Sequence, residues 1–143
     1  MKILERAEAE PLANKNQDFI QMPFGLLGLE ENKKYLLLAS PEEAPFLWLQ
    51  MAEEPNISFL VVSPFVVMPT YQPELSADDV EFLGLEKPED AMIFNIVTLR
   101  GSQGPTANLK GPIVVNRLNL RAKQIIPVNA ANYSVQQAFP NLS

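Results

Sequence analysis

Seventeen Asp and Glu side chains are the groups in this sequence of 143 residues best able to carry acid–base or metal chemistry. Several occur as adjacent pairs, namely Glu30/Glu31, Glu42/Glu43, Glu53/Glu54 and Asp78/Asp79. Neighbouring side chains diverge on both strands and helices, so such pairs do not converge on one ion, and no spacing matches a calcium loop. The sequence therefore predicts no metal site.

Histidine and cysteine are both absent, which removes the commonest general base, the commonest zinc ligand and every thiol nucleophile. Two carboxylates brought together by folding could still hydrolyse a glycosidic bond. A small carboxylate-dependent hydrolase, or another enzyme on a β-barrel, is therefore the alternative function. Because the carboxylates lie in proline-bounded segments typical of a surface, we favour a protein that is not an enzyme.

Two glycine-containing segments, FGLLGL at 24–29 and GSQG at 101–104, are the candidates for phosphate binding. Neither has the lysine and hydroxyl that end a P-loop, nor the strand–glycine–helix context of a dinucleotide site. We assign the first to a tight bend and the second to a hairpin connection. No cofactor is expected.

Acidic and basic side chains are segregated along the chain, although the formal net charge is only −6. Residues 1–99 contain all the acidic residues and carry a net charge of −11, whereas residues 100–143 carry +5. This asymmetry indicates either two surfaces of opposite sign or a fold that mixes both segments on one surface. The five basic residues of the second segment lack interleaved aromatics, so we expect no direct binding of nucleic acid.

Short β-prone segments separated by Pro, Gly and Asn must position these side chains. The candidate strands are 35–39, 46–51, 58–63, 92–99, 113–116 and 124–128, with weaker candidates at 3–8 and 18–22. Several are apolar on both faces, as in strands that are covered on each side or closed into a barrel. The sequence predicts a mainly β, small single-domain β-barrel-like fold over 1–143, with short, mostly antiparallel strands and a frayed tail at 129–143.

One or two short helices are expected beside the strands, the main one at 76–83. Ser76 suits the N-cap, and Asp78 and Asp79 place negative charge in the first turn, where the helix dipole favours it. Gly84 suits the left-handed stop after Leu83. A second turn is expected from residue 88 onward.

Neither a secretion signal nor a membrane span is visible. Glu5, Glu8 and Glu10 lie where a signal peptide needs an apolar core. The apolar run at 59–68 is interrupted by Pro64 and is shorter than the roughly 20 residues of a membrane helix. We expect a cytoplasmic protein with no membrane partner.

Two side chains stand out from their apolar neighbours. Asn108 is a polar residue within TANLKGPIVVN at 106–116, where a buried amide needs several hydrogen bonds and can brace neighbouring loops. Trp48, between two leucines, is expected in the core with a partner for its indole N–H.

Taken in order, the segments of this chain resemble the flagellar assembly factor FliW family. The matching segments are FGLLGLEENKKYLLL, PFLWLQ, ISFLVVSPF, PTYQPELSADDVEFLGL, FNIVTL, TANLKGPIVVN and RAKQII. The most specific is TANLK-x-PIV-x-N, which makes Thr106, Asn108, Pro112 and Asn116 structural motif residues, and PFLWLQ adds Trp48 to them.

The resemblance implies a small β-barrel-like protein that acts by binding. Members of the family bind flagellin in the cytoplasm, and they also bind the translational repressor CsrA and relieve its repression of flagellin translation. Flagellin competes for the factor, so its accumulation silences its own synthesis. A closed barrel leaves no unpaired strand edge and favours a monomer, whereas an unpaired edge strand could instead pair across a dimer. Of these two states, we expect the monomer.

An RNA-binding repressor needs a basic surface, so an acidic surface is expected to bind it here. The candidate partner-binding residues are Glu53, Glu54, Tyr71, Glu74, Asp78, Asp79 and Glu81. Tyr71 is either an exposed aromatic anchor of the kind found at binding hot spots or a residue packed over the barrel end.

Overall fold

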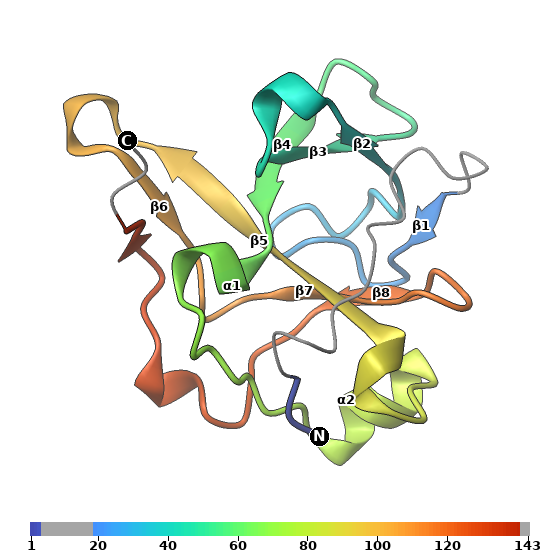
Figure 1. Cartoon of the computed structure of the whole chain (residues 1–143). Helices are drawn as coiled ribbons and strands as arrows, with labels where there is room; N and C mark the ends of the chain where they lie inside the picture. The colour runs from blue at the N-terminus through green and yellow to red at the C-terminus, as the bar shows by residue number, and fades with distance from the viewer. Residues whose placement is uncertain (4–18, 141–143) are drawn as a thin grey trace.

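In a computed structural model of the chain, which describes residues 1–3 and 19–140, the longest strand, β5 (Ala91–Leu99), organises the sheet (Figure 1). One edge of β5 pairs with β4 (Ser58–Val62), and the other pairs first with β7 (Ile113–Asn116) and then with β6 (Pro105–Ala107). Because both edges are used, β5 joins all the other strands into one sheet.

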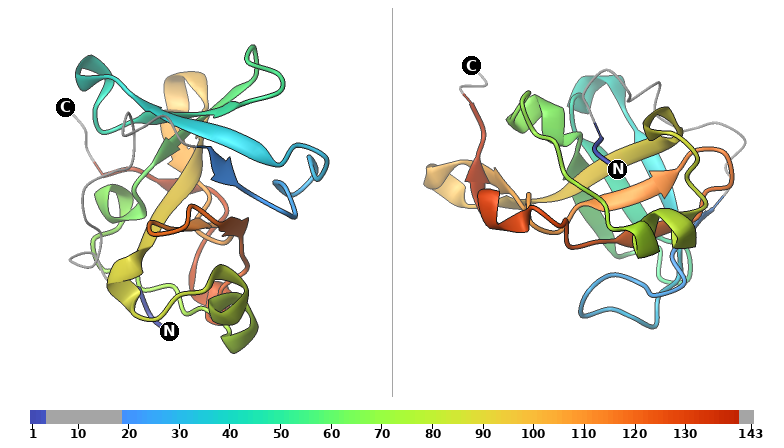
Figure 2. Two further views of the ribbon diagram at one scale, coloured as in Figure 1. Left: turned by 90° about the vertical axis from the view of Figure 1, so that its right-hand side faces the viewer. Right: turned by 90° about the horizontal axis from the view of Figure 1, so that it is seen from below.

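The sheet curls strongly on either side of β5 (Figure 2). Beyond β4 lie β3 (Leu47–Met51), β2 (Lys34–Ala39) and β1 (Ile20–Gln21), whereas β8 (Ala122–Gln124) follows β7 and β9 (Gln137–Ala138) follows β6. All these pairs are antiparallel. A parallel bridge between Gln21 and Arg121 brings the two ends of the curl together. The predicted mainly β, antiparallel fold is confirmed as a half-barrel.

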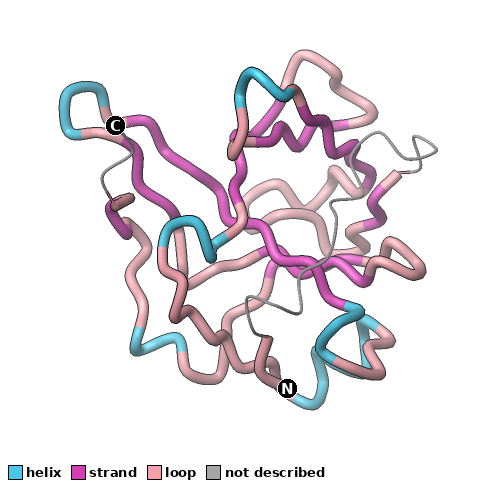
Figure 3. Tube along the Cα trace, in the orientation of Figure 1, coloured by secondary structure: helices cyan, strands magenta, loops and turns pink. Residues whose placement is uncertain are grey.

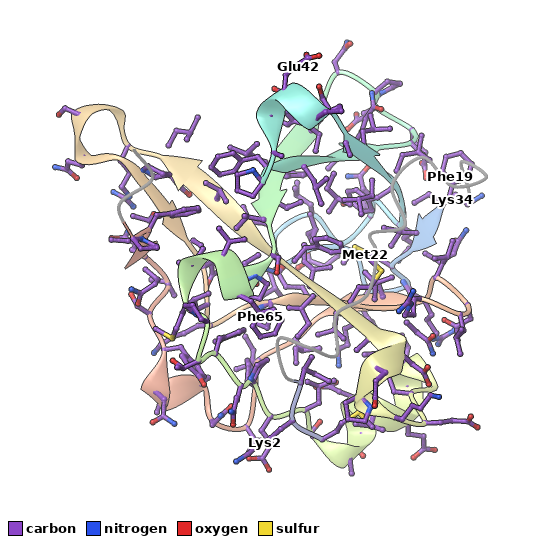
Figure 4. The ribbon with its side chains drawn as sticks, in the orientation of Figure 1. Lys2, Phe19, Met22, Lys34, Glu42 and Phe65 are labelled. Atoms are coloured by element: carbon purple, nitrogen blue, oxygen red, sulfur yellow. The ribbon has the colours of Figure 1, made fainter. Side chains whose placement is uncertain are left out.

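The curled sheet separates two apolar clusters, because successive residues of a strand point to opposite faces. The inner core consists of Ile20, Met22, Leu26, Tyr35, Leu37, Leu49, Met51, Val61, Met92, Phe94, Ile113, Val115 and Ala122. The outer core consists of Ile3, Val62, Phe65, Val67, Tyr71, Leu75, Leu83, Leu85, Ala91, Ile93, Val97, Ala107, Leu109, Val114 and Ile125. Figure 4 labels Met22 from the inner core and Phe65 from the outer one.

Short helical segments lie in the connections between the strands (Figure 3). They are α1 (Pro64–Val67), α2 (Ala77–Leu83) and the 3-10 turns η2 (Pro41–Glu43), η3 (Pro88–Asp90), η4 (Gly101–Gln103) and η5 (Ala130–Asn132). Among the described residues, no helix is both long enough and apolar enough to span a bilayer.

Helix α2 follows the capping signals of its sequence, which confirms the predicted helix. The Ser76 hydroxyl accepts a hydrogen bond from the Asp79 amide at 3.1 Å, and Gly84 ends the helix with a left-handed φ of 71°. Leu83 turns into the outer core. The turn expected from residue 88 is η3.

Two expectations about the C-terminal part of the chain are wrong. The strand predicted at 124–128 is β8 at Ala122–Gln124, because Pro127 has no N–H to extend a ladder. The tail predicted to fray at 129–143 carries η5 and β9 in its described part, and β9 pairs with β6 up to residue 138. Residues 141–143 of the predicted tail lie outside the described residues. The Phe139 ring lies 5.8 Å from that of Phe46, so this segment packs on the rest of the molecule.

The N-terminal strand candidates have different outcomes. The candidate at 18–22 corresponds to β1, which is only two residues long. The candidate at 3–8 lies outside the described residues apart from Ile3, which is fully buried in the outer core.

Trp48 is only half-buried, so the expectation of a core tryptophan is wrong. Its neighbour Leu49 occupies the inner core, and alternation places Trp48 on the outer face of β3, opposite Leu38 and Leu60 on the adjacent strands. The indole Nε1 donates to Glu43 Oε1 at 3.2 Å, which supplies the partner that this N–H needs.

Candidate functional site

The turn that follows β6 is closed by the side chain of Asn108. Its Oδ1 accepts hydrogen bonds from the backbone amides of Lys110 at 3.0 Å and Gly111 at 3.1 Å. A Cβ on Gly111 would lie 3.1 Å from Asn108 Nδ2 and 3.2 Å from Gln124 Nε2, so this position favours glycine for lack of space. Asn108 thus fixes the shape of the turn at 108–111.

Two buried side chains support this turn from beneath. Asn95 Nδ2 donates to the Asn108 carbonyl at 2.6 Å, and the Tyr71 hydroxyl donates to the Leu109 carbonyl at 2.7 Å. Tyr71 is completely buried and packs edge-on against Tyr133, with ring centroids 4.6 Å apart. Burial raises the pKa of the Tyr71 hydroxyl, which stays protonated as a donor. The exposed-anchor interpretation of Tyr71 is therefore wrong, and the packing interpretation holds.

Gln124 connects the turn at 108–111 to the loop at 22–30. Its Nε2 donates to the Gly111 carbonyl at 3.0 Å, and its Oε1 accepts from the Leu27 amide at 3.0 Å. Within the loop, Glu30 accepts from the Gly28 amide at 2.8 Å, and backbone hydrogen bonds lower the pKa of the Glu30 carboxyl. Gly25 and Gly28 have φ values of 64° and 89°, which fits the tight bend assigned to this segment.

An open cleft of about 340 Å³ lies between this loop and a fork in the sheet. The fork forms because β4 and β5 pair only at Val61↔Ile96 and Val62↔Asn95, beyond which β4 pairs with β3 alone and β5 with β6 alone. The cleft is lined by Leu26, Leu27, Leu29, Phe59, Ile96 and Val135, and by the polar side chains of Thr98, Arg100, Asn108, Gln124 and Gln136.

The remaining motif residues belong to the framework around this cleft and α2. Asn116 Nδ2 donates to the carbonyls of Leu83 at 2.9 Å and Gly84 at 3.2 Å, so it caps the end of α2. The Pro112 carbonyl accepts from the Ile125 amide at 2.9 Å. Thr106 lies in β6 opposite Thr98 of β5, beside the cleft.

The structure divides the acidic candidate residues between two distant places. Glu53 and Glu54 are exposed in the β3–β4 hairpin, whereas Asp78 and Glu81 are exposed on α2, with half-buried Glu74 just before it. The hairpin and α2 lie at opposite ends of the molecule (Figures 1 and 2). These carboxylates therefore do not form one continuous face.

Asp79 differs from its neighbours on α2. Only 7% of it is exposed, and its carboxylate forms a salt bridge of 2.6 Å with Lys123 Nζ. It therefore offers no exposed carboxylate to a partner, which corrects the expectation for this residue. The Arg121 guanidinium also lies 4.0 Å from the centre of the Phe82 ring on α2. The basic C-terminal segment thus folds onto the acidic one, and charges of both signs share this surface.

Leu27, Arg100 and Gln124 line the cleft but were not predicted as site residues from the sequence. The two adjacent leucines between glycines in FGLLGL were the available signal, since a tight bend exposes some of its side chains. Nothing in the sequence places Arg100 near them. In the part of the chain that the structure describes, no three Asp or Glu side chains are grouped so that they could hold a metal ion.

The curled antiparallel half-barrel places this chain among the small, mainly β proteins, and a solved structure with this fold matches the whole chain. The crystal structure of the flagellar assembly factor FliW is similar with a TM-score of 0.79 and 29% identity, over 100% of both chains. Residues 3–139 match the family model described as FliW protein. The chain therefore belongs to the FliW family.

Curated relatives agree with this assignment. The flagellar assembly factor FliW of Syntrophus aciditrophicus (strain SB) is 43% identical over 110 residues, which are 76% of this chain and 70% of that protein. The protein of the same name from Leptospira biflexa serovar Patoc is 36% identical over 124 residues, which are 85% of this chain and 80% of that protein.

Proposed function

We propose that this protein is a non-catalytic, monomeric cytoplasmic flagellar assembly factor that binds flagellin and antagonises the translational repressor CsrA. Flagellin level would then control flagellin translation, because free factor sequesters the repressor and accumulated flagellin occupies the factor. The family's name, flagellar assembly factor, supports the flagellar role. The two partners are those that the resemblance in the sequence implies.

The observation that carries the repressor half of the proposal is the exposed charge around α2. We call Glu74, Asp78 and Glu81 the α2 surface. A basic RNA-binding protein is attracted to such carboxylates, which raise the rate of encounter and orient the complex. Binding there would place the carboxylates of the α2 surface against the basic groups with which the repressor binds RNA. RNA and this protein would then exclude each other from the repressor.

Hydrogen bonds and a salt bridge hold α2 in place, so the α2 surface has its shape before a partner binds. Ser76 caps the first turn, Asn116 caps the last, and the Lys123–Asp79 salt bridge ties the helix to the residues around β8. A surface that does not need to be ordered on binding loses less conformational entropy. We assign Asp79 to this supporting role, and Glu53 and Glu54 to a separate, weaker contact.

Charge reversal on α2 tests this assignment. The double variant Asp78→Lys/Glu81→Lys should weaken binding of the organism's own CsrA by about tenfold at low salt, with most of the loss in the association rate. The loss should shrink as salt is added, because screening weakens exposed charges. Titration calorimetry and stopped-flow kinetics would measure both quantities.

The matched control is Glu31→Lys/Glu42→Lys, which reverses two exposed charges away from α2. Equal affinity of both double variants and the unmodified chain would show that the α2 surface is not the repressor's site. If the unmodified chain bound neither CsrA nor flagellin, the proposed function itself would be wrong. Light scattering of the chain alone would test the monomer.

A further inference from the structure

We propose that the cleft between the loop at 22–30 and the fork of β4 and β5 is the docking site for a short partner segment that carries large apolar side chains and a carboxylate. This inference rests on the proposed function, because it assigns the cleft to flagellin and not to the repressor.

The cleft presents apolar side chains that no described residue covers. Phe59 and Ile96 pack against the inner core, while Leu27 and Val135 at the rim are 62% and 54% exposed. Leu29, also at the rim, is 37% exposed. When a partner removes adjacent apolar side chains of a concave site from water, their burial stabilises the complex.

Side-chain hydrogen bonds hold the walls of the cleft in place. Gln124 spans from the Gly111 carbonyl to the Leu27 amide, so it connects the turn at 108–111 with the rim. Asn108 closes that turn. A cleft fixed in this way keeps its shape without a ligand, which reduces the entropic cost of binding.

The charge of the cleft selects an acidic occupant. Among the described residues that line the cleft, Arg100 is the only one with a charged side chain, and it forms no ion pair with any other described residue. The protein as a whole carries a net charge of −6, whereas the exposed Arg100 guanidinium makes the cleft locally positive. A carboxylate beside apolar anchors would pair with the guanidinium, whereas a basic RNA-binding surface would be repelled by it.

The size of the cleft limits the occupant to a short segment. Its volume of about 340 Å³ lies at the small end of the roughly 300–1,000 Å³ typical of ligand pockets. Such a space accepts a few side chains, as in the grooves that bind one face of a peptide. Of the two proposed partners, only flagellin remains, because the repressor is the basic one.

Two variants with matched controls test the cleft. Leu27→Glu and Arg100→Glu alter the rim and its cation, whereas Leu118→Glu and Lys87→Glu make the same changes at exposed residues outside the lining. The probes are the organism's own flagellin, its CsrA, and anilinonaphthalene sulfonate, a dye that is itself an apolar anion. Circular dichroism of each variant verifies that the fold is retained.

The expected result is that the unmodified chain binds the dye and that flagellin displaces it while CsrA does not. Both cleft variants should lose at least about tenfold in affinity for the dye and for flagellin, and both controls should bind as the unmodified chain does.

Three other outcomes would overturn the inference, and they differ in what they say of the proposed function. Equal flagellin binding by the cleft variants and the controls would show that flagellin binds outside the cleft. The proposed function would not be affected by that result. Displacement of the dye by CsrA alone would reverse the assignment of the partners. Absence of binding to both proteins would end the proposed function and the assignment of the cleft together.

Discussion

The α2 surface and the cleft lie on either side of the loop at 22–30, yet they are made of different kinds of side chain. Phe24 of the loop packs on Phe82 of α2 with ring centroids 4.9 Å apart, while Leu27 of the same loop lines the cleft. The α2 surface consists of carboxylates on a short capped helix, and the cleft consists of apolar side chains around one arginine. Two neighbouring regions therefore favour partners of opposite character.

This difference separates two physical tasks. Exposed charge acts over roughly 8–10 Å at ordinary salt, so the α2 surface affects how fast a partner arrives. Apolar burial acts only at contact, so the cleft affects how long a partner stays. A protein that exchanges one partner for another benefits from having both, because charge and contact can be changed independently.

The largest effect is expected from breaking the framework on the α2 side. Asn116→Ala removes the donor to the Leu83 and Gly84 carbonyls and the acceptor for the Leu118 amide, all at a residue only 2% exposed. Leaving such groups unpaired should lower the free energy of unfolding by about 2–4 kcal/mol. Urea denaturation would measure the loss.

Asn119→Ala is the control for that variant, because Asn119 is exposed and its side chain reaches the Leu83 carbonyl only at 3.5 Å. Its Oδ1 also accepts a hydrogen bond from the Arg121 amide at 2.8 Å, at an exposed position of the same turn. Asn119→Ala should lower the free energy of unfolding by less than about 1 kcal/mol. Equal losses in the two variants would mean that Asn116 does not hold α2 in place.

A smaller effect is expected on the side of the cleft. Gln124→Leu removes the hydrogen bonds that the Gln124 side chain makes with the Gly111 carbonyl and the Leu27 amide. Their loss should lower the free energy of unfolding by about 1–3 kcal/mol. It should also loosen the rim, so flagellin affinity should fall while CsrA affinity does not. Gln103→Leu, at an exposed residue of η4, should change neither quantity. A variant that lost both partners equally would abolish the distinction between the two regions.

The smallest effect concerns pH and the loop that the two regions share. Backbone hydrogen bonds lower the pKa of the Glu30 carboxyl below its ordinary value of 4.5, which means that folding favours the ionised form. The stabilisation of the fold by the Glu30 carboxylate is therefore fully present at a pH above the ordinary pKa. It is lost as the pH falls through the lowered pKa of the folded protein. Titration of the Glu30 carboxyl by NMR should show a midpoint below its ordinary value. Glu30→Gln should abolish the pH dependence of the Gly28 amide signal.

The strands with strong apolar patterns and the capped helix were predictable from the sequence, because their signals are local. Ser76 and Gly84 mark α2 to within a residue, and the segment at 113–116 is β7 without adjustment. Strands β6 and β9 were missed because three and two residues carry too little pattern. Their pairing depends on partners far along the chain.

The site was less predictable than the fold for the same physical reason. Charge can be counted along a sequence, so the acidic residues of α2 could be named in advance. The cleft joins side chains near positions 27, 59, 100 and 135, which only the fork of β4 and β5 brings together. The burial of Asp79 and Tyr71 depends on Lys123 and Leu109, and no local pattern indicates either contact.

The parallel bridge between Gln21 and Arg121 has a consequence for how the half-barrel opens. One bridge, the hydrogen bond from the Gln21 amide to the Leu120 carbonyl and the hydrogen bond from the Leu27 amide to the Gln124 side chain join the ends of the curl. In contrast, β2 and β3 pair over five residues. Local unfolding begins where the fewest hydrogen bonds must break. Local unfolding of the half-barrel should therefore begin at this junction. It would expose the inner core to water from one side and leave the outer core buried.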